Sequence, residues 1–296
     1  MNTPSHIKVA LLQQAYKGSR EAMIESSARM IKEAADSDAQ LVALQELHTR
    51  EYFCQSENSR FFDYASDFDA DRAFFSALAK KHSIVLLTSL FEKRTAGIYH
   101  NTALVFEKDG SLAGKYRKMH IPDDPQFYEK FYFTPGDLGF EPICTSLGKL
   151  GVLICWDQWY PEAARIMALK GAQMLIYPTA IGWFDEDSIE EKARQKQAWI
   201  AVQRGHSIAN GLPTLAINRV GFEKDISGVG SGIRFWGSSF AFGAQGELLA
   251  QASEEAEEIL YAHIDLARSE EVRRMWPFLR DRRIESYDEI LKRFCD

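Results

Sequence analysis

Three polar side chains that are suited to nucleophilic chemistry each stand at the end of a short apolar run of the sequence. They are Glu46, Lys118 and Cys155. Such runs are typical of buried strands, and open α/β sheets place reactive groups beyond the carboxyl ends of their strands. A thiol nucleophile needs a base that takes its proton and a cation that holds the developing oxyanion. We expect the three residues to supply this set on one rim of a sheet, without a histidine.

The segment around Cys155 predicts a turn between a strand and a helix. Leu150–Ile154 is typical of a buried strand, and Pro161 with Glu162 begins a helical pattern a few residues later. Backbone N–H groups at such a turn can lower a thiol pKa and bind an oxyanion. Taken alone, however, a cysteine after an apolar strand is more often a buried small residue.

The other two residues also have purely structural interpretations. A glutamate at a strand end, such as Glu46, can simply be solvated, and a lysine such as Lys118 is commonly a solvated edge charge. None of the seven histidines is clearly placed as the partner of a papain-like cysteine, although a partner distant along the chain stays open.

The composition is typical of a globular protein with an acidic surface. The 296 residues are 46% hydrophobic and 26% charged, which fits one large α/β domain or two ordinary ones. The net charge of −7 argues against nucleic acid and an anionic membrane as partners, and it favours a cationic small substrate only weakly.

The cysteines and the start of the chain give expectations about metals and location. Cys54, Cys144, Cys155 and Cys295 are scattered without a C-x-x-C pair, so neither a zinc site nor a dithiol redox motif is indicated. No apolar run reaches the ~18 residues of a membrane-spanning helix. The first residues lack a basic region followed by an apolar one, so we expect a cytoplasmic protein.

The apolar patterns alternate as in two βαβ units, which predicts an α/β fold. The expected strands are Ile7–Gln13, Leu41–Leu44, Ile84–Leu90, Tyr99–Glu107, Ser111–Lys118, Glu141–Leu147, Leu150–Ile154, Met174–Tyr177, Leu215–Arg219, Phe235–Phe242, Glu247–Ala252 and Ile259–Ile264. The expected helices are Ser19–Ala35, Asp71–His82, Glu162–Lys170, a long helix that Ser188 caps and that ends at Asn210, and Leu266–Met275.

Residues 119–137 form a long irregular segment rich in aromatic side chains. Long loops inside compact domains are usually functional or disordered, and so many rings favour packing over a site. Glu129 is the single glutamate of this segment, and the sequence leaves open whether it lies at an exposed rim or is buried.

Three motifs resemble the signature regions of the nitrilase (carbon–nitrogen hydrolase) superfamily. They are Leu44–Leu47, Tyr116–His120 and Val152–Asp157, and they occur in the family's order and spacing. The resemblance covers almost the whole chain. It implies a four-layer α-β-β-α sandwich with two central mixed sheets, and neither a metal nor an organic cofactor.

The resemblance also implies a role for each matching residue. Cys155 would be the nucleophile and Glu46 the general base. Lys118 and the backbone N–H of Trp156 would hold the oxyanion. Glu129 matches the family's second glutamate, which orients substrate or assists proton transfer.

The resemblance further implies a subunit organisation. Residues 1–265 would form the catalytic domain, and residues 266–296 a helix and tail at a subunit interface. The protein would then be a homo-oligomer, either a dimer or a multiple of dimers.

More narrowly, Phe127–Asp137, Ile154–Arg165 and Tyr177–Trp183 resemble the branch of N-carbamoylputrescine amidohydrolases. That branch works in putrescine synthesis from agmatine. The implied reaction passes through a cysteine thioester and converts a carbamoylated amine into an amine, carbon dioxide and ammonia.

The substrate pocket is less clearly indicated by the sequence. Asp185, Glu186 and Asp187 either bind the substrate's free ammonium or decorate the start of the next helix, where carboxylates favour the helix dipole. Tyr52 and Trp183 are equally plausible as pocket walls and as core residues.

Several other activities stay open. A related amidase would act on N-carbamoyl-β-alanine, an ω-amide of a dicarboxylic acid or an aliphatic amide, and a carboxylate substrate would need an arginine or lysine in the pocket. The glutaminase part of an amidotransferase is less favoured, since the chain has no room for a synthetase domain. From a different class, the chain would be a catalytically idle scaffold, against which the intact Glu46, Lys118 and Cys155 argue.

Overall fold

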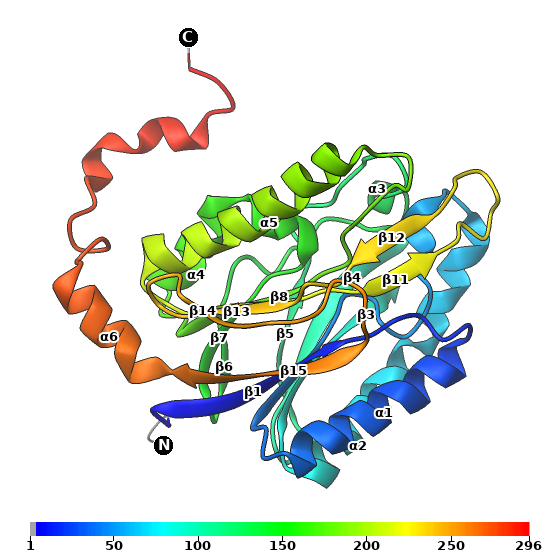
Figure 1. The fold of residues 1–296 in the computed structure, drawn as a ribbon, viewed down its shortest axis with the longest axis horizontal. Helices are drawn as coiled ribbons and strands as arrows, with labels where there is room; N and C mark the ends of the chain where they lie inside the picture. The colour runs from blue at the N-terminus through cyan, green and yellow to red at the C-terminus, as the bar shows by residue number, and fades with distance from the viewer. Residues whose placement is uncertain (1–3, 296) are drawn as a thin grey trace.

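The computed structural model describes residues 4–295 and is built around two six-stranded sheets that pack face to face between outer helices (Figure 1). The four-layer α-β-β-α sandwich is therefore confirmed. The strands are β1 (His6–Gln13), β2 (Leu41–Leu44), β3 (Val85–Thr95), β4 (Ile98–Phe106), β5 (Leu112–Arg117), β6 (Ile143–Thr145), β7 (Gly148–Val152), β8 (Met174–Pro178), β9 (Gly182–Trp183), β10 (Thr214–Ile217), β11 (Val220–Glu223), β12 (Ile233–Trp236), β13 (Phe240–Phe242), β14 (Leu248–Gln251) and β15 (Glu258–Asp265). The α-helices are α1 (Arg20–Asp36), α2 (Phe68–His82), α3 (Glu129–Tyr132), α4 (Pro161–Leu169), α5 (Ile189–Asn210) and α6 (Leu266–Met275). Short 3₁₀-helices are η1 (Phe53–Gln55), η2 (Ser59–Asp67), η3 (Cys155–Trp159), η4 (Ile284–Ser286) and η5 (Asp288–Leu291).

The first sheet has the strand order β15-β1-β2-β3-β4-β5. Strands β1, β2 and β3 are parallel, and β3, β4 and β5 form antiparallel hairpins. Because two reversals restore the direction of the chain, β5 runs the same way as β2. The ends of β2 and β5 therefore reach the same rim of this sheet.

The second sheet has the order β14-β13-β10-β8-β7-β6, with β7, β8 and β10 parallel. All five residues of β8 are buried, as expected for parallel strands that are covered on both faces. A core cluster between the two sheets contains side chains from both, among them Val9, Leu87, Val152 and Ile176. This shared core fixes the two sheets relative to each other.

The long helix α5 begins and ends as the sequence predicts. Ser188 accepts a hydrogen bond from the backbone N–H of Glu191 at 3.1 Å, which caps the first turn. Gly211 follows the last turn with a φ of 59°, a conformation that glycine adopts without strain. The cap places Glu191 in the first turn, next to the segment that follows β8.

The prediction of one strand over Phe235–Phe242 is wrong. The chain forms β12 and β13 instead, and these strands belong to different sheets. Gly237 and Ser238 lie between them with φ values of 48° and 55°, so the backbone turns sharply there. The apolar pattern continues across this turn, which hides the break. Strand β12 pairs with β11 and β9 in a small third sheet.

The aromatic segment 119–137 is ordered by packing. It contains the short helix α3, and Tyr132 and Phe133 join a cluster with Phe53 and Phe91. The segment returns to the sheet at Gly136, where an added Cβ would lie 2.1 Å from the carbonyl oxygen of Arg117. The packing that the sequence predicts for these rings is therefore confirmed.

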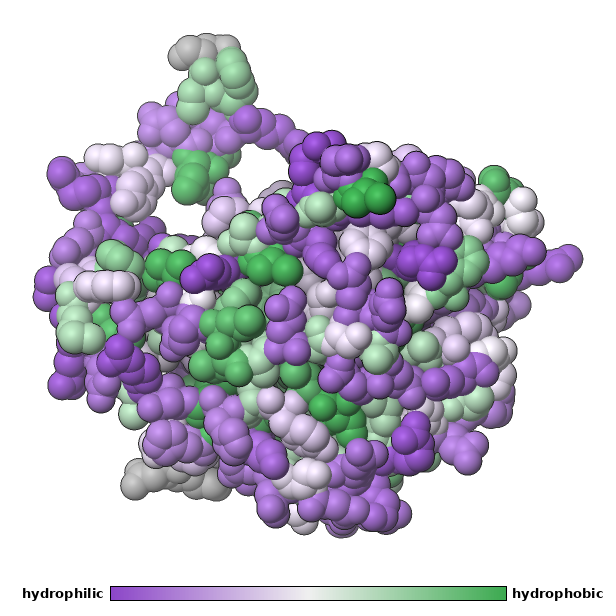
Figure 2. Space-filling model, viewed as in Figure 1, coloured by the Kyte–Doolittle hydropathy of each residue, from purple (hydrophilic) through white to green (hydrophobic). Residues whose placement is uncertain are grey.

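The C-terminal segment after β15 consists of α6, η4 and η5 and runs along the outside of the molecule (Figure 1). Figure 2 shows a gap between the body and part of this segment, and apolar side chains that gather on the surface of the body in the same view. The side chains of Ile290, Leu291 and Phe294 are 63%, 89% and 79% exposed. Within residues 4–295, no helix has both the length and the apolar character needed to cross a membrane.

Candidate active site

Four strand ends from the two sheets meet at one place. The first sheet contributes Glu46 after β2 and Lys118 after β5, and the second contributes Cys155 after β7 and Ala180 after β8. The backbone N–H of Glu46 donates to the carbonyl of Thr179 at 3.4 Å, and the thiol of Cys155 points to the carbonyl of Ala180 at 3.8 Å. The structure thus brings the three residues into one buried site. The expectation that they lie on the rim of a single sheet is wrong, because the packing of two sheets brings Cys155 to the other two.

Lys118 lies between two carboxylates. Its Nζ donates to Glu46 Oε1 at 2.8 Å and to Glu129 Oε2 at 2.5 Å. All three side chains are fully buried. The question that the sequence leaves open for Glu129 is settled here, because the side chain is inside and its Oε1 accepts a hydrogen bond from the Tyr52 hydroxyl at 2.7 Å.

The two oxygens of Glu46 are in different situations. Oε1 accepts from Asn101 Nδ2 at 2.7 Å as well as from Lys118. Asn101 is itself held by Ser89, whose hydroxyl donates to Asn101 Oδ1 at 3.2 Å. Oε2 is buried without a hydrogen-bond partner among the described residues. An unpaired buried carboxylate oxygen is costly, which marks Oε2 as the atom available to accept a proton.

Burial and mutual charge set the pKa values of this cluster. Burial alone would lower the pKa of Lys118, but the charges of Glu129 and Glu46 outweigh it and hold the pKa well above its usual value. Burial raises the pKa of Glu129 to about 7; the positive charge of Lys118 opposes this shift and Glu46 adds to it. The cluster therefore combines a permanent cation with a carboxyl that titrates near neutrality.

Cys155 occupies a strained turn. It begins η3 and has a φ of 44°, which is uncommon for a residue other than glycine. Burial, followed by the charge of Glu46, raises the pKa of the thiol well above its usual value. The turn can lower a thiol pKa, but here desolvation outweighs the lowering by Lys118 and by the backbone. A neutral thiol of this kind needs a base to become a nucleophile.

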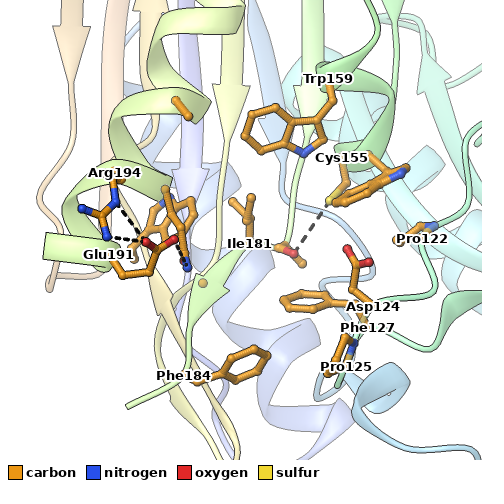
Figure 3. A pocket seen from close by; sticks show the side chains of 16 residues that line it. Pro122, Asp124, Pro125, Phe127, Cys155, Trp159, Ile181, Phe184, Glu191 and Arg194 are labelled. Atoms are coloured by element: carbon orange, nitrogen blue, oxygen red, sulfur yellow. Dashed lines mark hydrogen bonds and ion pairs between the residues drawn. The ribbon is translucent and has the colours of Figure 1, made fainter. Parts of the chain in front are cut away.

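A cavity of about 460 Å³ opens at Cys155 and Trp156 (Figure 3). Its walls are largely apolar and include Phe127, Trp159, Ile181, Phe184 and Trp236. The charged side chains that line it are Asp124, Glu191 and Arg194. In Figure 3, Cys155 and Asp124 lie on one side of the cavity and the Glu191–Arg194 pair on the other. The space suits a small, mainly apolar chain with a polar end.

The predicted acidic run does not form the wall of this cavity. Asp185 is exposed and pairs with Arg234 at 2.8 Å, and Asp187 accepts a hydrogen bond from Gln195 at 3.4 Å. Glu186 is exposed. The ion pair with the exposed Arg234, on β12, already engages the carboxylate of Asp185. Glu191, Arg194 and Asp124 occupy the wall instead.

The two predicted aromatic walls are both interior residues. Tyr52 is buried behind the site and contacts Glu129, so it acts on the cluster rather than on the cavity surface. Trp183 packs against Trp236, and its indole N–H donates to the carbonyl of Lys192 at 3.0 Å. The neighbours of Trp183 in sequence, Gly182 and Phe184, line the cavity.

Some of the site residues carry only weak sequence signals. Glu191 stands at the third position of a helix that Ser188 caps, a spacing that predicts a capping role rather than a pocket. Asp124 lies in an irregular segment with no periodicity. Asn101 lies inside β4, two strands away from β2 in the sheet, and its contact with Glu46 depends on the tertiary fold.

Among the described residues, no group of three or more histidine, cysteine, aspartate or glutamate side chains is arranged to hold a metal ion. The chemistry that the arrangement supports is acyl transfer. The charge of Glu46, which has one open oxygen, acts on a buried thiol, a lysine lies beside that carboxylate, and the first-turn N–H groups of η3 lie next to the thiol.

Comparisons with known proteins agree with this chemistry. The family model described as carbon-nitrogen hydrolase matches residues 8–274. The chain is 40% identical to a citrullinase of Francisella tularensis over 98% of this chain and 100% of that protein. It is also 40% identical to an N-carbamoylputrescine amidase of Solanum tuberosum, over 96% of this chain and 95% of that protein. A crystal structure of a carbon-nitrogen hydrolase from Helicobacter pylori is 65% identical, with a TM-score of 0.96 over 98% of this chain and 100% of that one.

Proposed function

This chain belongs to the carbon–nitrogen hydrolase family, and from that premise we propose that it hydrolyses N-carbamoylputrescine to putrescine, carbon dioxide and ammonia. The observation that carries the chemistry is the position of Lys118 between Glu46 and Glu129, beside a neutral and buried Cys155. The proposal assigns Cys155 as nucleophile, Glu46 as general base, Lys118 and the Trp156 N–H as oxyanion donors, and Glu129 as the assisting carboxyl.

The first half of the reaction transfers the carbamoyl group to the enzyme. Glu46 Oε2 takes the proton of the Cys155 thiol while the sulfur attacks the carbamoyl carbon. The electron pair of the carbonyl moves onto its oxygen, which Lys118 Nζ and the N–H of Trp156 stabilise. Collapse of this intermediate breaks the C–N bond, and Glu46 delivers the proton to the departing amine. A thioester between Cys155 and the carbamoyl group remains.

The second half returns the enzyme to its starting state. Glu46 takes a proton from water as the water oxygen attacks the thioester carbon. The resulting oxyanion uses the same two donors, and its collapse expels the Cys155 thiolate, which recovers its proton from Glu46. The released carbamic acid breaks down to carbon dioxide and ammonia. Glu129 favours the protonated form of Lys118, and Glu46 adds to this effect whenever it is ionised.

The cavity supports a carbamoylated diamine as substrate. Apolar walls suit a short methylene chain, and Asp124 contributes an exposed carboxylate to the lining. We propose that Asp124 attracts the free ammonium of the substrate. This assignment replaces the acidic run Asp185–Asp187, which lies off the cavity wall.

A second candidate is citrulline, which carries the same ureido group but ends in an α-amino acid. The observation that favours it is Arg194 on the cavity wall, paired with Glu191. A guanidinium and a carboxylate side by side complement a zwitterion. However, Arg194 Nε and Nη2 both donate to Glu191 Oε2, at 3.0 and 2.7 Å, so its charge is already largely engaged. A diamine leaves that pair intact, which is why we place citrulline second.

We also propose that residues 1–265 are the catalytic unit and that the segment after them joins subunits of a homo-oligomer. The exposed apolar side chains of the segment, among them Leu291 and Phe294, support this role. Exposed apolar patches of this kind mark sites of association.

The test is ammonia release by the purified protein from four substrates, with Cys155→Ala as the blank. The four are N-carbamoylputrescine, citrulline, N-carbamoyl-β-alanine and glutaramate. Turnover of N-carbamoylputrescine well above the others supports the proposal. Preference for citrulline would keep the mechanism and move the substrate to the second candidate. No turnover of any substrate, together with an unreactive Cys155 thiol, would favour a catalytically idle scaffold.

A further inference from the structure

Asp157 is a buried carboxylate to which the chemistry above gives no task. It lies in η3, two residues after Cys155, and its side chain is 0% exposed. Its Oδ2 accepts from the Ile154 N–H at 2.9 Å and from the Tyr116 hydroxyl at 2.8 Å. Its Oδ1 accepts from the backbone N–H of His120 at 3.0 Å and contacts His120 Nδ1 at 2.7 Å. Each oxygen therefore has two partners.

These partners flank the two central residues of the site. Tyr116 and His120 lie two positions before and two positions after Lys118, and Ile154 directly precedes Cys155. The carboxylate thus bonds to the strand end that carries the lysine and to the turn that carries the thiol. Those two segments come from different sheets, so Asp157 is a bridge between the sheets at the site itself.

The turn that Asp157 supports is the strained one. Cys155 has a positive φ. The Asp157 side chain accepts a hydrogen bond from the Ile154 N–H, and the Asp157 backbone N–H donates to the Ile154 carbonyl at 3.0 Å, so the two bonds close the turn. The rings of Tyr160 and His120 stack at 3.8 Å with an angle of 5° between their planes. The turn is therefore attached to the lysine segment at two points, and a conformation of this kind persists only when its surroundings hold it.

We propose that Asp157 is a positioning residue that holds the Cys155 turn in register with Lys118, so that the thiol meets both its base and its oxyanion donor. The inference rests on the proposed thiol chemistry. A carboxylate is required because only an ionised acid can accept all four donors, and His120 Nδ1 must carry a hydrogen to contact it. Burial, together with the Asp157 charge, raises the pKa of Tyr116 well above its usual value, so its hydroxyl stays a donor.

The first test is Asp157→Asn, which keeps the volume of the side chain. It replaces one carboxylate oxygen by an NH₂ group, which then lies opposite the hydrogen-bond donors that the oxygen accepted from. We expect kcat to fall at least about tenfold, since small displacements of reacting groups are costly, while KM changes by less than about threefold. The rate at which iodoacetamide modifies Cys155, followed by mass spectrometry of its peptide, should fall in parallel. That second readout needs no substrate, so it separates a failure of this inference from a wrong substrate.

Two milder variants cover the case in which Asp157→Asn does not fold. Tyr116→Phe removes one donor, and His120→Phe removes the ring nitrogen while keeping a ring to stack on Tyr160. Each should lower kcat and Cys155 modification together, by about two- to fivefold, as expected for a modest misplacement. The control is Leu78→Ala, on the buried face of α2, which should lower the melting temperature without changing either rate measured below it.

The inference is overturned if Asp157→Asn keeps kcat and Cys155 modification within twofold of the wild type. It is also overturned if both milder variants leave the two rates unchanged. A third contrary outcome is that Leu78→Ala, with a loss of melting temperature equal to that of Asp157→Asn, lowers the two rates as much as Asp157→Asn does. In those cases Asp157 would serve stability alone.

Discussion

Lys118 Nζ and Asn101 Nδ2 both donate to the same oxygen of Glu46, Oε1, at 2.8 and 2.7 Å. The other oxygen, Oε2, is buried and unpaired among the described residues. The two oxygens of the Glu46 carboxylate thus differ in their contacts. Oε1 accepts the two hydrogen bonds that orient the group, and Oε2 is left open. Under the proposed mechanism, the open oxygen receives the proton of a thiol whose pKa burial has raised.

Glu46→Gln tests this division directly. The amide can still accept from Lys118 and Asn101, but it cannot take a proton. We expect kcat for ammonia release to fall by about 10²–10⁴-fold, the usual contribution of a general base, with a folded protein and a small change in melting temperature. Glu190→Gln, an exposed change in the first turn of α5, is the control and should retain full activity. Retention of more than a tenth of the wild-type kcat by Glu46→Gln would exclude Glu46 as the base.

Lys118→Met should destabilise the protein as well as inactivate it. The change leaves two fully buried carboxylates without their cation, and breaking a buried ion pair costs about 3–5 kcal/mol. Loss of an oxyanion donor costs a further ~10²–10³ in kcat. Urea unfolding should show the stability loss, and Lys118→Met combined with Glu129→Gln should recover part of it because one unpaired charge is removed. An equal or larger loss in the double variant would contradict this account.

Glu129 makes the stability depend on pH between about 4.5 and 7. Burial raises its pKa from 4.5 to about 7, so in that window the folded protein holds a proton that the unfolded chain has released. The unfolded state then binds fewer protons, and the contribution of this group to stability falls as pH rises, by at most ~1.4 kcal/mol per pH unit. The stabilising contribution of Glu129 to the free energy of unfolding is complete below pH 4.5 and is lost above pH 7.

The measurement compares urea unfolding of the wild type and Glu129→Gln at pH 5 and pH 7.5. The stability of the wild type relative to the variant should fall by about 2–3 kcal/mol between the two values. Burial lowers the pKa of His48 to about 3, so its contribution to stability changes with pH in the opposite direction. This contribution is the same in both proteins and cancels when the stability of the variant is subtracted from that of the wild type. A difference that is independent of pH would mean that Glu129 is ionised throughout.

That each of the three polar residues stands at a strand end was predictable, because an apolar run precedes each of them. The expectation that all three share the rim of one sheet was wrong, because Cys155 comes from the second sheet. Glu46, Lys118 and Cys155 each follow an apolar run, and β2 and β5 in one sheet and β7 in the other all end at the site. The long helix was predictable at both ends because Ser188 and Gly211 act locally. Features that depend on residues close together in the sequence, such as these helix ends, can therefore be predicted from the sequence.

The wall of the cavity was not predictable in the same way. Asp124 and Glu191 reach it only through the tertiary fold, and Asp185 is drawn off by Arg234, which lies 49 residues further along the chain. The direction of the Cys155 pKa shift also depends on burial by distant segments rather than on the turn that contains it. Net acidity near a loop therefore does not show which carboxylates line the cavity.

Asp124→Asn should weaken binding of a cationic substrate. The carboxylate lines the cavity at an exposed position, so a single charge contact is worth about 1 kcal/mol and its loss should raise KM for N-carbamoylputrescine roughly fivefold. The neighbouring Asp123→Asn is a matched control, because that residue is equally charged and exposed but does not line the cavity. Equal KM values for the two variants would remove Asp124 from the substrate site.

Arg194→Gln separates the two candidate substrates. If the substrate is a diamine, loss of this cation should leave KM unchanged or lower it, since Glu191 is then free to attract an ammonium. If the substrate is citrulline, the same change should raise KM by about tenfold, because a charge-assisted contact to the carboxylate is lost. Steady-state kinetics with both compounds decides between them, and Lys196→Gln, which lies outside the cavity lining on the same helix, is the control.

The exposed apolar tail should carry the assembly of the protein. Leu291→Glu combined with Phe294→Glu places two charges on side chains that are 89% and 79% exposed, so the fold of one subunit has little reason to change. A partner that buries these side chains, in contrast, would have to desolvate both charges, which is strongly unfavourable. Analytical ultracentrifugation should therefore show oligomers for the wild type and smaller species for the double variant. Lys292→Glu alters the net charge equally without touching an apolar side chain, so it should assemble normally. A wild type that sediments as a monomer at micromolar concentration would contradict the proposed role of the tail.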